Sequence, residues 1–484
     1  MSPQDEKQLS PFRQPKHHLE HDALDLMFDE HSDEDIDDTH YAPATPMAGK
    51  TALVRQPAVL CGEAKMALAE RAAAGGKPYP EITPVEARNA APPPLPSKEE
   101  VLEVMDLNCG GVPARFYRPS RNKEDYHPSK KHMLGLTIYF HGGGWVVGDI
   151  EKLDHVCRCL ANSSGHCVLN VGYRLAPEHP YPTPLEDCLT ATRWAHGHAE
   201  SKLGCDSNRI CVAGDSAGGN LAAVVANEAC IPLRLQVLIY PVTDCRPLAP
   251  SGAGSGPRPG SSYDVYGKDN TYGLSYDDML WFYNHYMCDK VSGRGKKAAS
   301  APRVSPICAS DTVLAAAPAT LLVTAECDVL RDEGLAYMEK LESLGVEASL
   351  YEVEGQIHGF WTYQLSMSDA RETLQRVAET IKIALHDDVA HSIWKQKKQN
   401  KKMPTDNEPT YKYIVVSPAQ MKKLKNGRKT KKPVSVRTPQ YAKPLERSSA
   451  ALLTKRVAKL TSQMEQVVHT NAEMRLSRAS VGGK

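Results

Sequence analysis

A run of small residues, Gly214-Asp215-Ser216-Ala217-Gly218-Gly219-Asn220, constrains the fold more than any other part of the chain. It follows an apolar segment, 210–213, that is typical of a buried strand, and it precedes 221–228, which is rich in helix formers. A serine in a tight strand-turn-helix connection has its hydroxyl exposed at a sheet edge, and small neighbours let the backbone pack closely around it. The N–H groups at the start of the following helix point toward developing negative charge. The run therefore predicts that Ser216 is a nucleophile.

A second glycine-rich segment lies upstream. The apolar run 136–140 reads as a strand and leads directly into His141-Gly142-Gly143-Gly144-Trp145. A phosphate-binding loop is excluded because no Gly-Lys-Ser/Thr follows. The pattern matches the HGGG-type loop that supplies backbone N–H groups to an oxyanion hole. His141 is expected to order this loop rather than to take part in the chemistry.

Two further polar residues follow predicted strands. Asp328 comes just after 320–325, and His358 comes just after 348–353. Taken alone, such an aspartate is usually a turn residue and such a histidine is usually structural. However, the carboxyl ends of parallel strands share one edge of a sheet, which is where open α/β sheets place their sites. Ser216, Asp328 and His358 also occur in the chain order of the α/β-hydrolase triad, so we expect them to act together.

Strands and helices alternate over the middle of the chain, which predicts a mostly parallel sheet covered on both faces. Expected strands lie near 104–107, 114–117, 136–140, 167–171, 210–213, 235–240, 320–325 and 348–353, with helices near 153–163, 186–196, 221–228, 277–286 and 334–344. Residues 244–300 interrupt the alternation. Their aromatic helix at 277–286 is either a lid over the substrate or an ordinary packing helix.

The formal net charge of zero conceals opposite charges at the two ends. Residues 1–48 carry 12 acidic and 3 basic side chains, a charge of −9, while 391–484 carry 22 basic and 5 acidic side chains, a charge of +17. We expect 1–50 to be a disordered acidic extension, 51–390 the folded domain, and 391–484 a largely disordered basic tail with a helix at about 450–476. Four interpretations of the basic tail stay open. It could be a solvated segment, bind nucleic acid or another polyanion, bind an anionic membrane, or act as a nuclear-localisation signal.

Neither a signal peptide nor a long apolar span is present in the sequence, so a cytoplasmic location is expected, with a nuclear one left open by the basic tail. The 13 cysteines are scattered, and many lie in apolar runs, so we interpret them as reduced buried thiols. Cys157-Arg158-Cys159 beside His155, and His196-Gly197-His198, lack the ligand spacing of a metal site. No metal is expected.

With these motifs in place, the chain resembles the hormone-sensitive-lipase family of α/β-hydrolases, which includes bacterial esterases and arylacetamide-deacetylase-like proteins. The resemblance covers about residues 80–388 and rests on 141–145, 173–179, 214–220, Ser305-Pro306, 327–334 and 357–360. It implies an α/β-hydrolase fold with a helical cap, built from about 56–95 and 244–300. It also implies that Ser216 is the nucleophile, His358 the general base and Asp328 its orienting acid. Backbone N–H groups would form the oxyanion hole, from Gly142, Gly143 or Gly144 together with Ala217, and we favour Gly143 and Gly144.

The resulting hypothesis is a serine hydrolase that cleaves small-to-medium carboxylic esters through an acyl-enzyme, with no cofactor. An amidase or deacetylase with the same triad is the alternative among enzymes. A scaffold that retains the fold and acts through its charged tails is the alternative from another class. A small-molecule ester is the expected partner, and homo-oligomerisation is left open.

Overall fold

The computed structural model of the chain describes residues 57–90, 97, 99–120, 133–249, 257–288 and 298–386. The predictions for the acidic extension at 1–50, the basic tail at 391–484 and its helix lie outside the described residues. Within these ranges, we find no helix that is both long and apolar enough to cross a bilayer.

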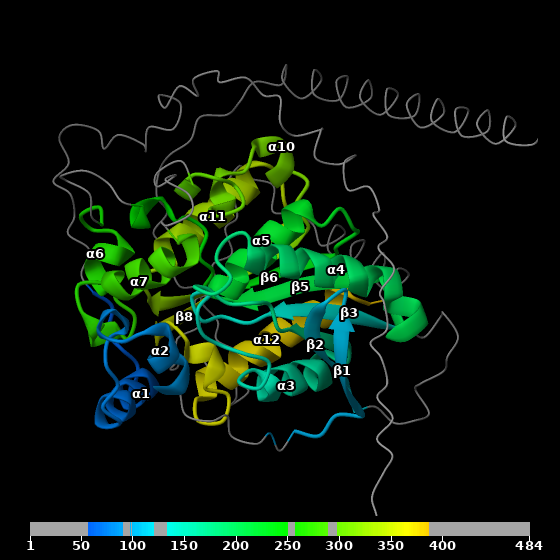
Figure 1. Cartoon of the computed structure of the whole chain (residues 1–484), viewed down its shortest axis with the longest axis horizontal. Helices are drawn as coiled ribbons and strands as arrows, with labels where there is room; N and C mark the ends of the chain where they lie inside the picture. The colour runs from blue at the N-terminus through cyan, green and yellow to red at the C-terminus, as the bar shows by residue number, and fades with distance from the viewer. Residues whose placement is uncertain are drawn as a thin grey trace, which may run out of the picture. The chain divides into compact units, whose positions relative to one another are not determined.

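An eight-stranded sheet forms the centre of the fold, in the order β1-β2-β4-β3-β5-β6-β7-β8 (Figure 1). Its strands are β1 (Glu103–Cys109), β2 (Val112–Arg118), β3 (Leu134–Phe140), β4 (Cys167–Val171), β5 (Cys205–Asp215), β6 (Leu235–Ile239), β7 (Ala319–Cys327) and β8 (Ala348–Ile357). The pairs β1–β2 and β2–β4 are antiparallel, and the other five pairs are parallel. The predicted α/β-hydrolase fold is confirmed.

Helices cover both faces of this sheet. They are α3 (Asp154–Ser164), α4 (Thr183–Lys202), α5 (Ala217–Glu228), α11 (Arg331–Ser343) and α12 (Ser368–Ala384). In Figure 1, α4, α5 and α11 lie above the strands and α3 and α12 below them. The side chains of β5 alternate accordingly, because Val212 packs in one core cluster and its neighbours Cys211 and Ala213 pack in the other. All three are fully buried, as expected for a parallel strand with both faces covered.

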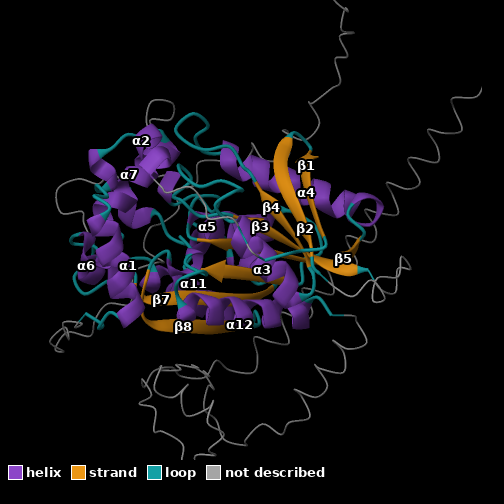
Figure 2. Cartoon of the chain, turned by 90° about the horizontal axis from the view of Figure 1, so that it is seen from below, coloured by secondary structure: helices purple, strands orange, loops and turns teal. Residues whose placement is uncertain are grey.

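Four further helices gather at one end of the sheet in both views (Figures 1 and 2). They are α1 (Gly62–Ala73), α2 (Pro84–Ala90), α6 (Ser262–Tyr266) and α7 (Tyr276–Met287), and we call them the helical cap. Tyr79 joins the two chain segments that form it. Its N–H donates to Asp278 Oδ1 at 3.1 Å, and its ring centroid lies 4.5 Å from that of Phe282.

The remaining regular elements are short. They are α10 (Asp311–Leu314) and the 3-10 turns at Tyr79–Glu81, Arg246–Leu248, Asn270–Tyr272, Pro306–Cys308 and Phe360–Thr362. All thirteen cysteines are free thiols. Eight of them are buried, as predicted, whereas Cys61, Cys159, Cys288 and Cys308 are half-buried and Cys230 is exposed.

Candidate active site

Ser216 lies at the sharp turn between β5 and α5. Its φ of 55° is in the left-handed region that side-chain-bearing residues rarely adopt. The Ser216 N–H donates to Ile239 O at 2.8 Å, which holds the strained turn against β6. Gly218 is required one residue into the helix, because a Cβ there would collide with the carbonyl oxygens of Phe140 and His141. The Ser216 side chain therefore stands at the carboxyl edge of the sheet, where the sequence places it.

The three predicted triad residues meet at this edge. Asp328 follows β7 and His358 follows β8, and the His358 ring contacts both Asp328 and Ser216. His358 Nδ1 lies 2.7 Å from Asp328 Oδ2, and His358 Nε2 lies 2.9 Å from Ser216 Oγ. A carboxylate only accepts hydrogen bonds, so Nδ1 carries the ring hydrogen and Nε2 is free to accept the serine proton. The Asp328 side chain is fully buried, so this hydrogen bond is shielded from water.

Asp215 fixes the glycine loop beside the serine. Its Oδ1 accepts the Gly142 N–H at 3.0 Å and the Tyr139 hydroxyl at 2.8 Å. Burial raises the pKa of the Asp215 carboxyl, while these two hydrogen bonds act in the opposite direction. Because the Gly142 N–H is already donated, it is not available to a substrate. We therefore correct the predicted set of oxyanion donors, from which Gly142 is removed.

His141 orients the next peptide unit. Its Nδ1 lies 2.8 Å from Gly142 O, and its ring stacks on Tyr173 at 4.3 Å. In a trans peptide, the carbonyl and the following N–H point in opposite directions. Holding Gly142 O therefore directs the Gly143 N–H away from His141. The imidazole is completely buried, and this burial lowers the pKa of His141 to about 4, so the ring is neutral at neutral pH. This position agrees with the predicted ordering role.

Burial of His141 should make the free energy of unfolding depend on pH in the acid range. The pKa of His141 is lowered from 6.5 to about 4 in the folded protein, so the unfolded chain binds a proton first as the pH falls. Well above pH 6.5, the ring is neutral in both states and this group does not destabilise the folded protein. As the pH falls from 6.5 toward 4, protonation of the unfolded chain lowers the free energy of unfolding by about 3 kcal/mol. We expect His141→Gln to remove this part of the pH dependence of the free energy of unfolding. Urea denaturation of both proteins at pH 7 and pH 4 measures it, and identical pH dependence in the two would contradict the assignment.

Three of the backbone N–H groups in the glycine loop and next to Ser216 in the sequence make no hydrogen bond with a described residue. Within the described part of the chain, those of Gly143, Gly144 and Ala217 donate to no acceptor. Ala217 begins α5, where the first N–H groups of a helix have no intrahelical partner. These unbonded N–H groups come from two separate elements, the glycine loop after β3 and the start of α5.

Tyr240 is a neighbour of His358 that the sequence did not single out. It follows β6 with a φ of 36°, and its ring centroid lies 4.5 Å from that of His358. The Tyr240 N–H donates to Val323 O at 2.6 Å, which secures this unfavourable backbone conformation. The ring therefore packs against the imidazole and limits its movement. No periodicity or motif in the sequence marks this contact.

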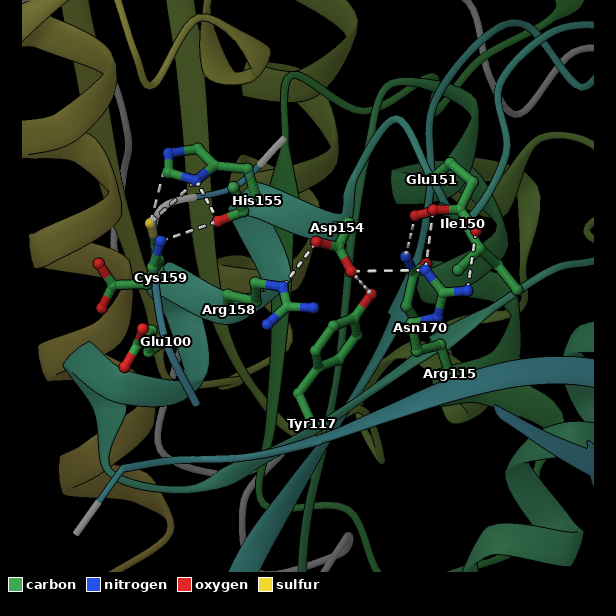
Figure 3. A network of polar contacts seen from close by, with 12 residues as sticks. Glu100, Arg115, Tyr117, Ile150, Glu151, Asp154, His155, Arg158, Cys159 and Asn170 are labelled. Atoms are coloured by element: carbon green, nitrogen blue, oxygen red, sulfur yellow. Dashed lines mark hydrogen bonds and ion pairs between the residues drawn. The ribbon is translucent and has the colours of Figure 1, made fainter. Parts of the chain in front are cut away.

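The cysteine and histidine clusters seen in the sequence do not converge. Figure 3 shows Cys159 beside His155 on α3, with Sγ 3.6 Å from Nε2, next to the ion pairs of Arg158 and Arg115 with Asp154. Cys157 is instead fully buried in the core. Among the described residues, no group of three or more His, Cys, Asp or Glu side chains could hold a metal ion.

Comparisons with known proteins agree with this geometry. The alpha/beta hydrolase fold family matches residues 137–362. The chain is 38% identical over 282 residues to an ethyl acetate hydrolase of Pseudomonas putida, covering 56% of this chain and 78% of the relative. It is 34% identical over 297 residues to the carboxylic ester hydrolase LipN of Mycobacterium tuberculosis, covering 59% and 71% of the two chains.

Solved structures of esterases also match this chain. A hyperthermophilic esterase from the archaeon Pyrobaculum calidifontis matches with a TM-score of 0.57 and 34% identity, over 68% of this chain and all of the esterase. A thermostable esterase from Pseudomonas putida matches with a TM-score of 0.59 and 30% identity, over 69% of this chain and all of that one.

The sheet order and the residues at its carboxyl edge define an α/β-hydrolase. Within that class, the chain belongs to the hormone-sensitive-lipase family.

Proposed function

We propose that this protein is a carboxylic-ester hydrolase that works through an acyl-enzyme on Ser216. The observation that carries the proposal is the continuous contact from Asp328 through His358 to Ser216, with distances of 2.7 and 2.9 Å. The relatives named as an ethyl acetate hydrolase and a carboxylic ester hydrolase support the same substrate class.

The residues divide the reaction into two proton transfers. Serine is almost fully protonated at neutral pH, so His358 Nε2 takes the hydroxyl proton as Ser216 Oγ attacks the ester carbonyl carbon. Asp328 keeps the other ring nitrogen protonated and stabilises the imidazolium that forms. His358 then gives its proton to the leaving alcohol. In the second half of the reaction, water loses a proton to the same nitrogen, attacks the acyl-enzyme, and releases the acid.

The tetrahedral oxygen that forms in each half must be stabilised. We assign this role to the N–H groups of Gly143, Gly144 and Ala217, which are fixed before the substrate arrives. Such fixed donors stabilise the transition state by about 3–4 kcal/mol each, because they need no reorganisation as charge develops.

The cap suggests which esters fit. The Phe282 ring of α7 fills the space that a side chain on Gly144 would occupy, and Phe282 is itself 4% exposed. An aromatic ring over one side of the oxyanion donors leaves little depth for an acyl chain. We therefore propose small-to-medium acyl groups as the substrate class.

Phe282 gives this substrate preference a test. We expect Phe282→Ala to raise the ratio of kcat/KM for a p-nitrophenyl octanoate to that for the acetate by at least about tenfold. Removing the ring makes room for several methylenes, each worth about 0.8 kcal/mol when buried. Trp281→Ala is the control for the loss of a neighbouring aromatic ring, since Trp281 lies on the same helix and packs on Phe282, Tyr79 and His285. An unchanged ratio in the Phe282 variant would show that the ring does not bound the acyl pocket.

The function itself is tested with the full chain and a series of p-nitrophenyl esters, alongside the matching aryl amide. Ester turnover well above amide turnover, together with fluorophosphonate labelling that Ser216→Ala abolishes, is the expected result. Faster amide cleavage would favour an amidase. Absence of Ser216-dependent labelling would favour a scaffold.

A further inference from the structure

The glycine loop touches the cap at three consecutive residues. The Phe282 ring covers Gly144, and the Trp145 ring stacks on Tyr286 with centroids 4.3 Å apart. The third contact is polar, because Arg88 Nε of α2 donates to Val146 O at 2.8 Å. The cap is therefore joined to the loop that carries the predicted oxyanion donors.

Arg88 is held firmly in this position. Its Nη2 donates to Ala176 O at 2.7 Å, and its guanidinium forms a bidentate ion pair with Glu178 at 2.9 and 2.7 Å. The Ala176 N–H in turn donates to Trp145 O at 2.9 Å. A planar guanidinium with four such hydrogen bonds has one orientation, unlike a lysine ammonium.

Two peptide units connect Arg88 to the oxyanion donors. The Val146 carbonyl and the Val147 N–H belong to one unit, and the Val147 N–H donates to Gly143 O at 2.9 Å. The same oxygen also accepts the Val146 N–H at 3.0 Å, so the unit that Arg88 holds supplies one of its two donors. The Gly143 carbonyl and the Gly144 N–H belong to the next unit. Because carbonyl and N–H point in opposite directions across each planar unit, fixing the first oxygen directs the last N–H. The chain of hydrogen bonds thus runs from Arg88 through Val146 and Gly143 to the Gly144 N–H.

We propose that Arg88 is a positioning residue for the oxyanion hole, which it orients and polarises through these two peptide units. The inference rests on the proposed ester hydrolysis. A charged donor at one end of a hydrogen-bonded chain strengthens the bonds that follow it. His141 supports the Gly143 N–H through Gly142 O in the same manner, so each glycine donor has its own support. For the Gly144 N–H, the cap supplies part of this support, because Arg88 holds the peptide unit of the Val147 N–H.

The test compares Arg88→Ala with Arg71→Ala. Arg71 is a matched control, since it lies in the same N-terminal segment and its Nη1 donates to a backbone carbonyl, Gly273 O, at 2.8 Å outside the glycine loop. Removing one oxyanion donor outright lowers kcat by about 10²–10³-fold, and Arg88 acts through such a donor, so we expect a smaller loss of about tenfold in kcat/KM. Arg71→Ala should stay within about twofold of the wild type.

The readout that separates positioning from folding is the inhibition constant of an alkyl trifluoromethyl ketone. Ser216 Oγ adds to its carbonyl carbon, the hydroxyl proton passes to His358, and the hemiketal oxygen then lies where the ester oxyanion forms. This constant should rise about tenfold in Arg88→Ala, matching the loss in kcat/KM. A partly unfolded preparation would lose activity but keep the constant unchanged. Millimolar guanidinium should restore part of the activity of Arg88→Ala and none of any loss in Arg71→Ala.

Arg88→Lys keeps the test decisive if the alanine variant does not fold. A lysine retains the positive charge but carries its donors on a single nitrogen, which cannot reproduce the guanidinium's contacts with Val146, Ala176 and Glu178. Its inhibition constant should therefore lie between those expected for the wild type and for Arg88→Ala. Equal losses in the Arg88 and Arg71 alanine variants, or a wild-type inhibition constant in Arg88→Lys together with unchanged kcat/KM, would overturn the inference. A wild-type protein that neither cleaves esters nor binds the ketone would overturn the proposed function instead.

Discussion

Ser216→Ala and His358→Ala should each lower kcat for a p-nitrophenyl ester by about a million-fold, and the double variant should be hardly slower than either. The reason is the 2.9 Å contact between Ser216 Oγ and His358 Nε2. Without the imidazole, the hydroxyl keeps its proton and is a poor nucleophile, and without the hydroxyl, the imidazole has no nucleophile to activate. Each single change therefore removes the same step.

Comparison of stability separates this loss from unfolding. Alanine retains the Cβ of serine, so the strained φ of 55° at position 216 is the same in both proteins. The Tm of Ser216→Ala should stay close to that of the wild type. Ser349→Ala is a suitable control for the chemical change, since Ser349 is an exposed residue of β8 and does not cap a helix. Losses that multiplied in the double variant would show that Ser216 and His358 act independently, and the triad assignment would be wrong.

Much of the site could be predicted because its signals are local. The glycines around Ser216 and after β3 are contiguous in sequence, and Asp328 and His358 each directly follow a strand. Parallel strands then bring these four positions to one edge without any knowledge of which strands are neighbours. The exact order of the sheet, and the antiparallel pairing of β1 and β2 at its edge, were not needed for this step.

The supports of the site could not be predicted, because their partners are far apart in the chain. Asp215 meets the N–H of Gly142 across 73 residues, and Arg88 meets Val146 O across 58. Such contacts have no periodicity and no fixed spacing. The Gly142 donor was wrongly included for this reason, since an N–H in a glycine loop looks available until its acceptor is known.

Helix ends were misjudged where packing overrides local preference. The helix expected at 186–196 extends over Thr183–Lys202 as α4. Pro184 is tolerated because the N–H groups of the first turn have no intrahelical partner. Gly197 costs about 1 kcal/mol relative to alanine, but Ala195 and Ala199 on either side are fully buried and offset it.

Asp328→Asn should lower kcat by about 10⁴-fold while leaving the fold intact. The carboxylate has two fixed partners, since Oδ2 accepts from His358 Nδ1 at 2.7 Å and Oδ1 accepts from the Leu330 N–H at 2.9 Å. An amide has only one oxygen for the two donors. If that oxygen stays on the Leu330 N–H, the amide NH₂ faces His358 Nδ1, and the ring hydrogen moves to Nε2.

In that tautomer, His358 presents an N–H to Ser216 and cannot take the hydroxyl proton. In the opposite amide orientation, the NH₂ group of the introduced asparagine would face the Leu330 N–H, so that two donors meet without an acceptor. Such a buried, unpaired donor costs about 1–3 kcal/mol. The Leu330 N–H therefore selects the inactive tautomer. Asp332→Asn provides the matched control, because Asp332 Oδ2 accepts from the Ser262 N–H and its Oδ1 pairs with Arg331. Steady-state kinetics and thermal unfolding of both variants provide the test. If Asp328→Asn lowers kcat by less than about tenfold with an unchanged Tm, the orientation of His358 is set by other neighbours, such as the Tyr240 ring.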